Sequence, residues 1–174
     1  MNEYKKAVSE FSNHVTNYPK SPFIAEALLK IGDSYYNLKE YTKALEYYNN
    51  VKYKHHNSPF VKDAEYGAIV SHKQLGNSEA ARAETERFVK KNPKAQISIT
   101  LQFQAAEELE AKKRLREALL AYRTVLSISE TSEFSDTALY RIGRILFETR
   151  EFYDAISSLT QLINNYPKSA YLID

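Results

Sequence analysis

The chain of 174 residues contains no cysteine, no tryptophan and only four glycines. The absence of cysteine excludes disulfides, thiol nucleophiles and cysteine-ligated metal sites, and leaves the redox compartment open. Four glycines are too few for the usual glycine-rich loops that hold phosphate groups. No apolar run approaches the roughly 18 residues that a bilayer-spanning helix needs. These absences exclude several classes of enzyme and predict no direct insertion into a membrane.

An excess of charge of one sign is also missing. Twenty-four basic residues face 22 acidic ones, and the formal net charge is only +2. Such a balance provides no general electrostatic attraction to nucleic acid or to an anionic membrane. The chain is instead rich in aromatic residues, with 14 tyrosines and eight phenylalanines. We therefore expect a protein or peptide partner and no nucleic acid.

One period organises the whole sequence. Small residues recur at steps of 37 positions, at Ala7, Ala44, Ala81, Ala118 and Ala155. Two further columns keep the same step, one small and one mostly aromatic: Ser21, Ser58, Ala95, Ser132 and Ser169, and Phe23, Phe60, Ile97, Phe134 and Tyr171. Three columns with one period and no insertion indicate a tandem array of structural repeats.

Each repeat has the pattern of two helices. In the range 22–58, apolar residues follow a helical spacing, pause at a polar break around Lys39, and resume from Tyr41. No window alternates apolar and polar residues long enough for a strand, so we expect an all-α protein of about nine helices. The predicted domain is a single array over 1–174, made of a truncated unit, four helix pairs and the start of a further unit: 1–21, then 22–58, 59–95, 96–132 and 133–169, then 170–174.

Glycine and alanine in the helices predict close helix contacts. The repeated alanine lets two helix axes approach to the short end of the usual range of about 8–10 Å. Gly32 and Gly143, each in the first helix of its pair, are expected to act in the same way. Because glycine in a helix costs about 0.5–1 kcal/mol relative to alanine, packing should compensate there.

These residues resemble the tetratricopeptide repeat family. Its pattern of a large apolar residue, Leu-Gly, Tyr, Ala, an aromatic and Pro is met in two units, by Leu28, Ile31, Gly32, Tyr35, Ala44 and Tyr48, and by Leu139, Ile142, Gly143, Leu146, Ala155, Leu159 and Pro167. The third and fourth units depart from it, for example at His72 and Thr85. The resemblance implies a right-handed α-solenoid of helical hairpins.

The 37-residue period is longer than the ordinary tetratricopeptide period of about 34 residues. With the phrases NYPKSPFIAEAL and NYPKSAYLID, the sequence is similar to bacterial cell-envelope members of the family, the BamD-like lipoproteins and the Tol–Pal-associated coordinator proteins. That resemblance implies a scaffold in the periplasm or cell envelope, with the cytoplasm as the alternative.

The family also implies where a partner binds, because its first helices line the concave side of the stack. The central column there consists of large apolar residues, Leu29, Tyr66, Phe103 and Tyr140. It suggests an exposed row for an extended or helical peptide; the alternative is that neighbouring helices half-cover this row. A flanking row consists of Glu26, Asp63, Thr100 and Thr137. The candidate partner-binding residues are Leu29, Asp33, Tyr36, Tyr66, Val70, Lys73, Phe103, Glu107, Glu110, Tyr140, Arg144 and Phe147.

No constellation of nucleophile, base and orienting group can be assembled from the sequence, so we predict no enzyme, no cofactor and no metal. The adjacent His55 and His56 lack the spacing of metal ligands on one helix face. The groove charges are mostly acidic, which disfavours RNA, although Arg141 and Arg144 could recognise a carboxylate. The predicted function is a non-catalytic protein-interaction scaffold. The alternatives are a segment of a filament or collar that forms a homo-oligomer through the exposed ends of the array and, less favoured, an RNA-binding helical repeat.

Overall fold

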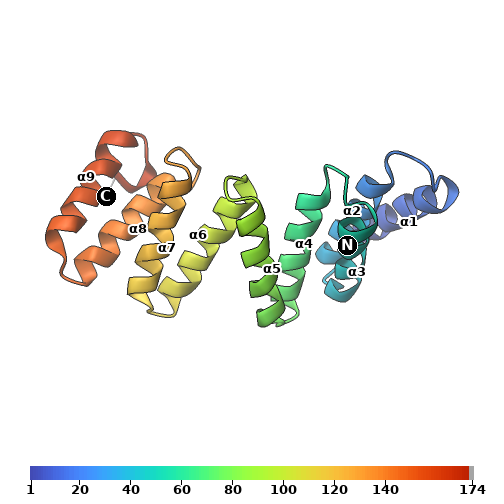
Figure 1. The fold of residues 1–174 in the computed structure, drawn as a ribbon, viewed down its shortest axis with the longest axis horizontal. Helices are drawn as coiled ribbons and strands as arrows, with labels where there is room; N and C mark the ends of the chain where they lie inside the picture. Colours follow the sequence, from blue (N-terminus) through green and yellow to red (C-terminus); the bar gives the residue numbers. More distant parts are fainter. Residues whose placement is uncertain (173–174) are drawn as a thin grey trace. The chain divides into compact units, whose positions relative to one another are not determined.

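A computed structural model describes residues 1–172, and in that range helices joined by turns and loops are present and strands are absent (Figure 1). The all-α helical repeat expected from the sequence is confirmed, with nine α-helices in the described part. They are α1 (Asn2–Asn17), α2 (Ile24–Asn37), α3 (Tyr41–Lys54), α4 (Val61–Gln74), α5 (Ser78–Lys91), α6 (Gln96–Ala111), α7 (Leu115–Ile128), α8 (Ser135–Glu148) and α9 (Phe152–Asn165), followed by the 3-10 turn η1 (Ala170–Leu172).

The tight turn inside each hairpin has the same backbone conformation and the same hydrogen bond in all four pairs. One residue per turn has a positive φ, between 58° and 73°, and these residues are again 37 positions apart: Lys39, Gly76, Lys113 and Arg150. The N–H group of the following residue donates to the carbonyl five residues earlier, at 2.8–3.0 Å. This left-handed conformation is the usual way for a helix to end. Only one of the four turns uses glycine, the residue that adopts it without strain.

The chain divides into two compact units, residues Met1–Phe88 and the residues from Val89 onward. The first unit contains α1 to α4 and most of α5. Its core lies among α2, α3 and α4, where Ala44, Ala64 and Ala68 are fully buried and let the helices approach. Lys52 of α3 forms an ion pair of 2.7 Å with Glu84 of α5, and both side chains are largely covered.

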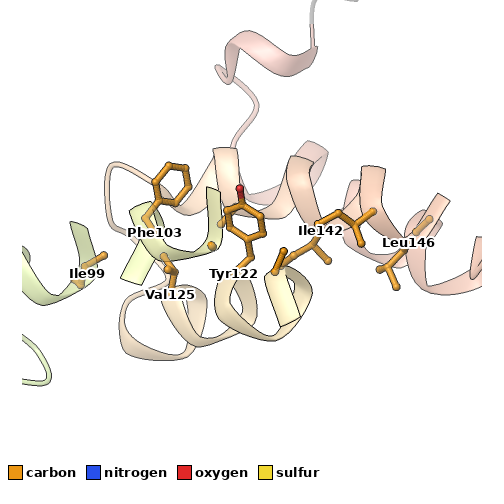
Figure 2. Packing of buried hydrophobic residues seen from close by; sticks show 11 residues of the cluster. Ile99, Phe103, Tyr122, Val125, Ile142 and Leu146 are labelled. Carbon is orange, nitrogen blue, oxygen red and sulfur yellow. The ribbon is translucent and has the colours of Figure 1, made fainter. Parts of the chain in front are cut away.

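The second unit has its own core among α6, α7 and α8. Figure 2 shows side chains that belong to this core, two from each helix: Ile99 and Phe103, Tyr122 and Val125, Ile142 and Leu146. The alanines at the helix crossings are again fully buried. Small residues at the crossings and large ones between them therefore build both cores by the same pattern.

The prediction that Gly32 and Gly143 allow close packing is confirmed. A methyl group on Gly32 would lie 2.7 Å from Cε1 of Tyr48, and one on Gly143 would lie 2.6 Å from Cδ2 of Leu159. Gly67 of α4, which was not singled out from the sequence, presses on the same tyrosine, with 2.5 Å between such a methyl group and Cζ of Tyr48. The ring of Tyr48 is thus held between two glycines from two different helices.

Candidate functional site

A pocket of about 410 Å³ opens between α2 and α4 in the first unit. Five of the six candidate residues of this unit line it, and the sixth, Lys73, lies further along α4. The pocket also includes Asp63 of the predicted flanking row. Its lining consists of Leu29, Lys30, Asp33, Tyr36, Tyr48, Phe60, Asp63, Tyr66, Gly67 and Val70.

Tyr48 links this pocket to the core beneath it. The side chain extends from α3 between α2 and α4 and is only 2% exposed. Its hydroxyl group donates a hydrogen bond of 2.9 Å to Oδ1 of Asp33. Because Gly32 and Gly67 have no side chains, the ring can occupy the space between the two helices. The aromatic ring and the carboxylate that it supports are therefore fixed by packing rather than by loop conformation.

The electrostatic character of the pocket is set by two carboxylates and one ammonium group. Nζ of Lys30 lies 3.8 Å from Oδ2 of Asp33, and both side chains are more than two-fifths exposed. Burial raises the pKa of Asp33; the hydrogen bond from Tyr48 and the charge of Lys30 act in the opposite direction, and Asp63 adds to the rise. Negative charge at Asp33 is therefore only partly compensated by the protein itself.

Replacement of Asp33 by asparagine should leave the free energy of unfolding near neutrality unchanged or raise it by less than about 0.5 kcal/mol. An acid with a raised pKa in the folded state binds more protons there than when unfolded, so its charge lowers stability as the pH rises through that pKa. The amide oxygen can still accept from Tyr48. Since the side chain is 43% exposed, water screens most of the penalty.

Urea unfolding of the wild type and Asp33→Asn, near neutrality and below the ordinary aspartate pKa of 3.8, measures this effect. The difference between the two proteins should shrink at the lower pH, where the wild-type carboxyl group is also neutral. A loss of more than about 1 kcal/mol at neutrality would show instead that the charge of Asp33 stabilises the fold.

The expectation of an exposed apolar row is wrong at two of its four positions. Leu29 is 5% exposed and Phe103 is 6% exposed. Phe103 stacks on Phe134 at 4.6 Å between ring centroids and meets Tyr122 edge-on at 5.6 Å. These residues belong to the cores, because the neighbouring helix pair covers them. Tyr66 and Tyr140, the other two members, are partly exposed.

The remaining candidates of the second unit occupy several environments. Tyr140 stacks on Tyr171 of η1 at 4.4 Å, and the Arg144 guanidinium lies 5.8 Å from the Tyr140 ring. Phe147 is 66% exposed and contacts Phe152 edge-on. Aromatic surface is therefore available to a partner on α8. Glu107 is exposed.

Glu110 is occupied within the protein. Its Oε2 accepts a hydrogen bond of 2.8 Å from the Tyr122 hydroxyl group, and its Oε1 accepts one of 3.2 Å from Nη1 of Arg141. Burial and the negative charge of Glu110 raise the pKa of Tyr122, which stays protonated and donates. Arg141, a candidate for recognising a partner carboxylate, is thus already paired.

Sequence reasoning missed Gly67 and Tyr48 as parts of the site. Tyr48 fits the repeat pattern, which predicts no role for it in a binding site. Gly67 did carry a signal, because the equivalent positions of the other pairs hold long polar side chains: Lys30, Gln104 and Arg141. A lone glycine in such a column marks a place where a side chain has been removed.

Comparisons with solved structures support the fold. MamA is 16% identical over 98% of this chain and 92% of its own, with a TM-score of 0.64. BtubC from P. vanneervenii is 11% identical over 93% of this chain and 72% of its own, with a TM-score of 0.68. YrrB is described as a TPR protein with an unusual peptide-binding site. It is 18% identical over 96% of this chain and 80% of its own, with a TM-score of 0.56. At these identities the likeness concerns the fold alone.

A comparison with curated protein sequences finds no match. Within residues 1–172, no helix combines the length and the apolar character that crossing a membrane requires. The model of one protein family, YfiO, described as outer membrane lipoprotein, matches residues 26–174. Because that match spans most of the sequence, and because the helical hairpins repeat throughout the described residues, the chain belongs to the YfiO family of tetratricopeptide-like proteins.

Proposed function

We propose that the chain is a non-catalytic scaffold that binds a peptide or protein partner through the pocket between α2 and α4. The pocket itself carries the proposal: it is open, and partly exposed Tyr36 and Tyr66 stand beside Val70 above a buried floor. Tyrosine provides large, rigid contact area at a small entropic cost, and such side chains dominate the energetics of protein interfaces.

The wider context of the proposal is a bacterial envelope assembly, with the chain in the periplasm. The description of its family, outer membrane lipoprotein, supports that location. YrrB, whose fold is similar, is described as having an unusual peptide-binding site, which supports a peptide as the ligand class. In the second unit, we propose that Tyr140, Arg144 and Phe147 make additional partner contacts, since they present aromatic and cationic surface on α8.

A peptide-display selection against the intact chain provides the test, followed by calorimetry with the best peptide. The double variant Tyr66→Ala, Val70→Ala should bind it at least tenfold more weakly, which corresponds to about 1.4 kcal/mol. Truncation of these partly exposed side chains removes contact area for the peptide and leaves the buried floor in place. The matched control is Tyr53→Ala, a tyrosine of the same unit that is 66% exposed on α3.

The outcomes separate clearly. Weaker binding in the double variant with unchanged binding in the control supports the pocket as the partner site. Equal affinity in all three proteins, with the double variant still folded by circular dichroism, would move the partner site away from α2 and α4.

Self-association is the second candidate function, and the surface of α9 favours it. Ile156 and Ile163 are exposed there. The equivalent residues 37 positions earlier, Leu119 and Leu126, pack against the core of the second unit, so the repeat normally covers these two positions. Light scattering over a concentration series distinguishes the two functions. A mass that grows with concentration supports self-association, and a constant monomer mass contradicts it.

A further inference from the structure

The two units offer an internal comparison, because residues 74 positions apart occupy equivalent places. Helices α3 and α7 have bounds that differ by 74 at both ends, and so do α4 and α8. Tyr48 therefore corresponds to Tyr122. By the same offset, Gly67 corresponds to Arg141. The side chain at this position of the second unit indicates which chemical group is missing from the first unit.

In the second unit, a guanidinium group fills this place. Arg141 donates through Nη1 to Oε1 of Glu110 at 3.2 Å, and the hydroxyl group of Tyr122 donates to the other carboxylate oxygen at 2.8 Å. The side chain of Arg141 is 31% exposed and that of Glu110 is 18% exposed. The repeat therefore accommodates a cation beside a tyrosine–carboxylate pair, in a largely covered position.

In the first unit, the tyrosine–carboxylate pair is present without a cation at the position of Arg141. The Tyr48 hydroxyl group bonds to Asp33, which lies on α2 as Glu110 lies on α6, one turn apart in register. Gly67 carries no side chain, and Leu29 is smaller than its counterpart Phe103. The Tyr48 ring occupies the space beside Gly67, and the pocket of about 410 Å³ is lined by Gly67, Leu29 and Asp33.

The pocket also has a carboxylate at a position where its counterpart has none. Asp63 adds a second carboxylate where the second unit has Thr137. The only ammonium group in its lining belongs to Lys30, whose distance of 3.8 Å and exposure of 49% make a weak surface ion pair. The pocket thus combines two carboxylates with tyrosine rings, the two kinds of group that attract a cation.

We propose that the pocket between α2 and α4 binds a basic side chain of the partner peptide, arginine in preference to lysine. This inference rests on the proposed function and specifies the chemistry of its ligand. A planar guanidinium group can donate to a carboxylate with two parallel N–H groups while its flat face lies on a tyrosine ring, whereas an ammonium group is a compact, strongly hydrated charge without that fixed fork. The bound arginine supplies from the partner the guanidinium group that Arg141 supplies to Glu110 in the second unit.

The test uses two small probes, N-acetyl-arginine amide and N-acetyl-citrulline amide, titrated into the ¹⁵N-labelled intact chain. Citrulline has nearly the same shape and no charge. We expect the arginine probe to shift the amide resonances of Gly67 and Asp33 in a saturable way. The citrulline probe should shift them at least tenfold less at equal concentration.

Two sets of variants keep the test independent of folding. Asp33→Asn with Asp63→Asn preserves the shape of the pocket and should abolish the response to arginine, while its spectrum remains that of the folded chain. Gly67→Arg should also abolish the response, but its β-carbon would lie 2.5 Å from Cζ of the buried Tyr48, so its result counts only if the variant keeps the spectrum of the folded chain. If Gly67→Arg does not fold, the asparagine variant alone decides the result.

Equal shifts from arginine and citrulline, or an arginine response that survives in the asparagine variant, would overturn the inference. The proposed function is judged separately, by the selected peptides. Peptides that need Tyr66 and Val70 but keep their affinity when each basic residue becomes citrulline would preserve the interaction site and refute its cationic ligand. Peptides that lose at least tenfold on that exchange would support both.

Discussion

Replacement of Tyr48 by alanine should lower the free energy of unfolding by about 3–5 kcal/mol, the range for truncating a large buried aromatic residue. The ring is 2% exposed and lies between Gly32 and Gly67. Its removal leaves a cavity between α2 and α4 that two helix backbones cannot close without moving. Asp33 also loses the hydroxyl group that donates to it.

Urea unfolding followed by circular dichroism measures this loss, with Tyr53→Ala as the matched control on the same helix. Because Tyr53 is mostly exposed, its truncation should change the free energy by less than about 0.5 kcal/mol. Tyr48→Phe separates the ring from the hydroxyl group and should cost about 0.5–1.5 kcal/mol. Similar values for Tyr48→Ala and Tyr53→Ala would contradict the packing described for α3.

The second large effect concerns Gly143, where valine should lower the free energy of unfolding by about 1–3 kcal/mol. A β-carbon there would lie 2.6 Å from Cδ2 and 2.7 Å from Cγ of Leu159. Real carbon atoms do not approach so closely, so α8 and α9 must separate or Leu159 must leave its rotamer. Thermal or urea unfolding measures the loss.

A compensating change at Leu159 tests the stated cause. Gly143→Val adds three carbon atoms and Leu159→Ala removes three, so the double variant conserves volume at this crossing. It should be more stable than the sum of the two single effects predicts, by at least about 0.5 kcal/mol. Strict additivity would show that the two residues do not compete for the same space.

The period of the sequence was sufficient to predict the helices and their close contacts. Alanine and glycine at fixed positions indicate where two helices come close together. Gly32 and Gly143 lie at such close contacts, as predicted. The backbone conformation of the hairpin turns was harder to predict from the sequence. Lys39 and Arg150 adopt the left-handed conformation without any sequence signal, because the geometry of the two flanking helices imposes it.

The site was harder to predict than the fold, for a physical reason. Helical spacing tells which residues share a face, but not how far a neighbouring helix covers them. Leu29 and Phe103 share the predicted face and are nevertheless buried. The pocket depends on a missing side chain at Gly67 and on a tyrosine from another helix, and such a combination appears only when the helices are packed.

Amide chemical-shift mapping of the intact chain with the selected peptide tests the central claim most directly. The account predicts that the largest shifts fall on α2 and α4, at Asp33, Tyr66, Gly67 and Val70, around one pocket. Largest shifts on the outer surface of α3 near Tyr53, or on α9 near Ile156, with α2 and α4 unperturbed, would contradict it.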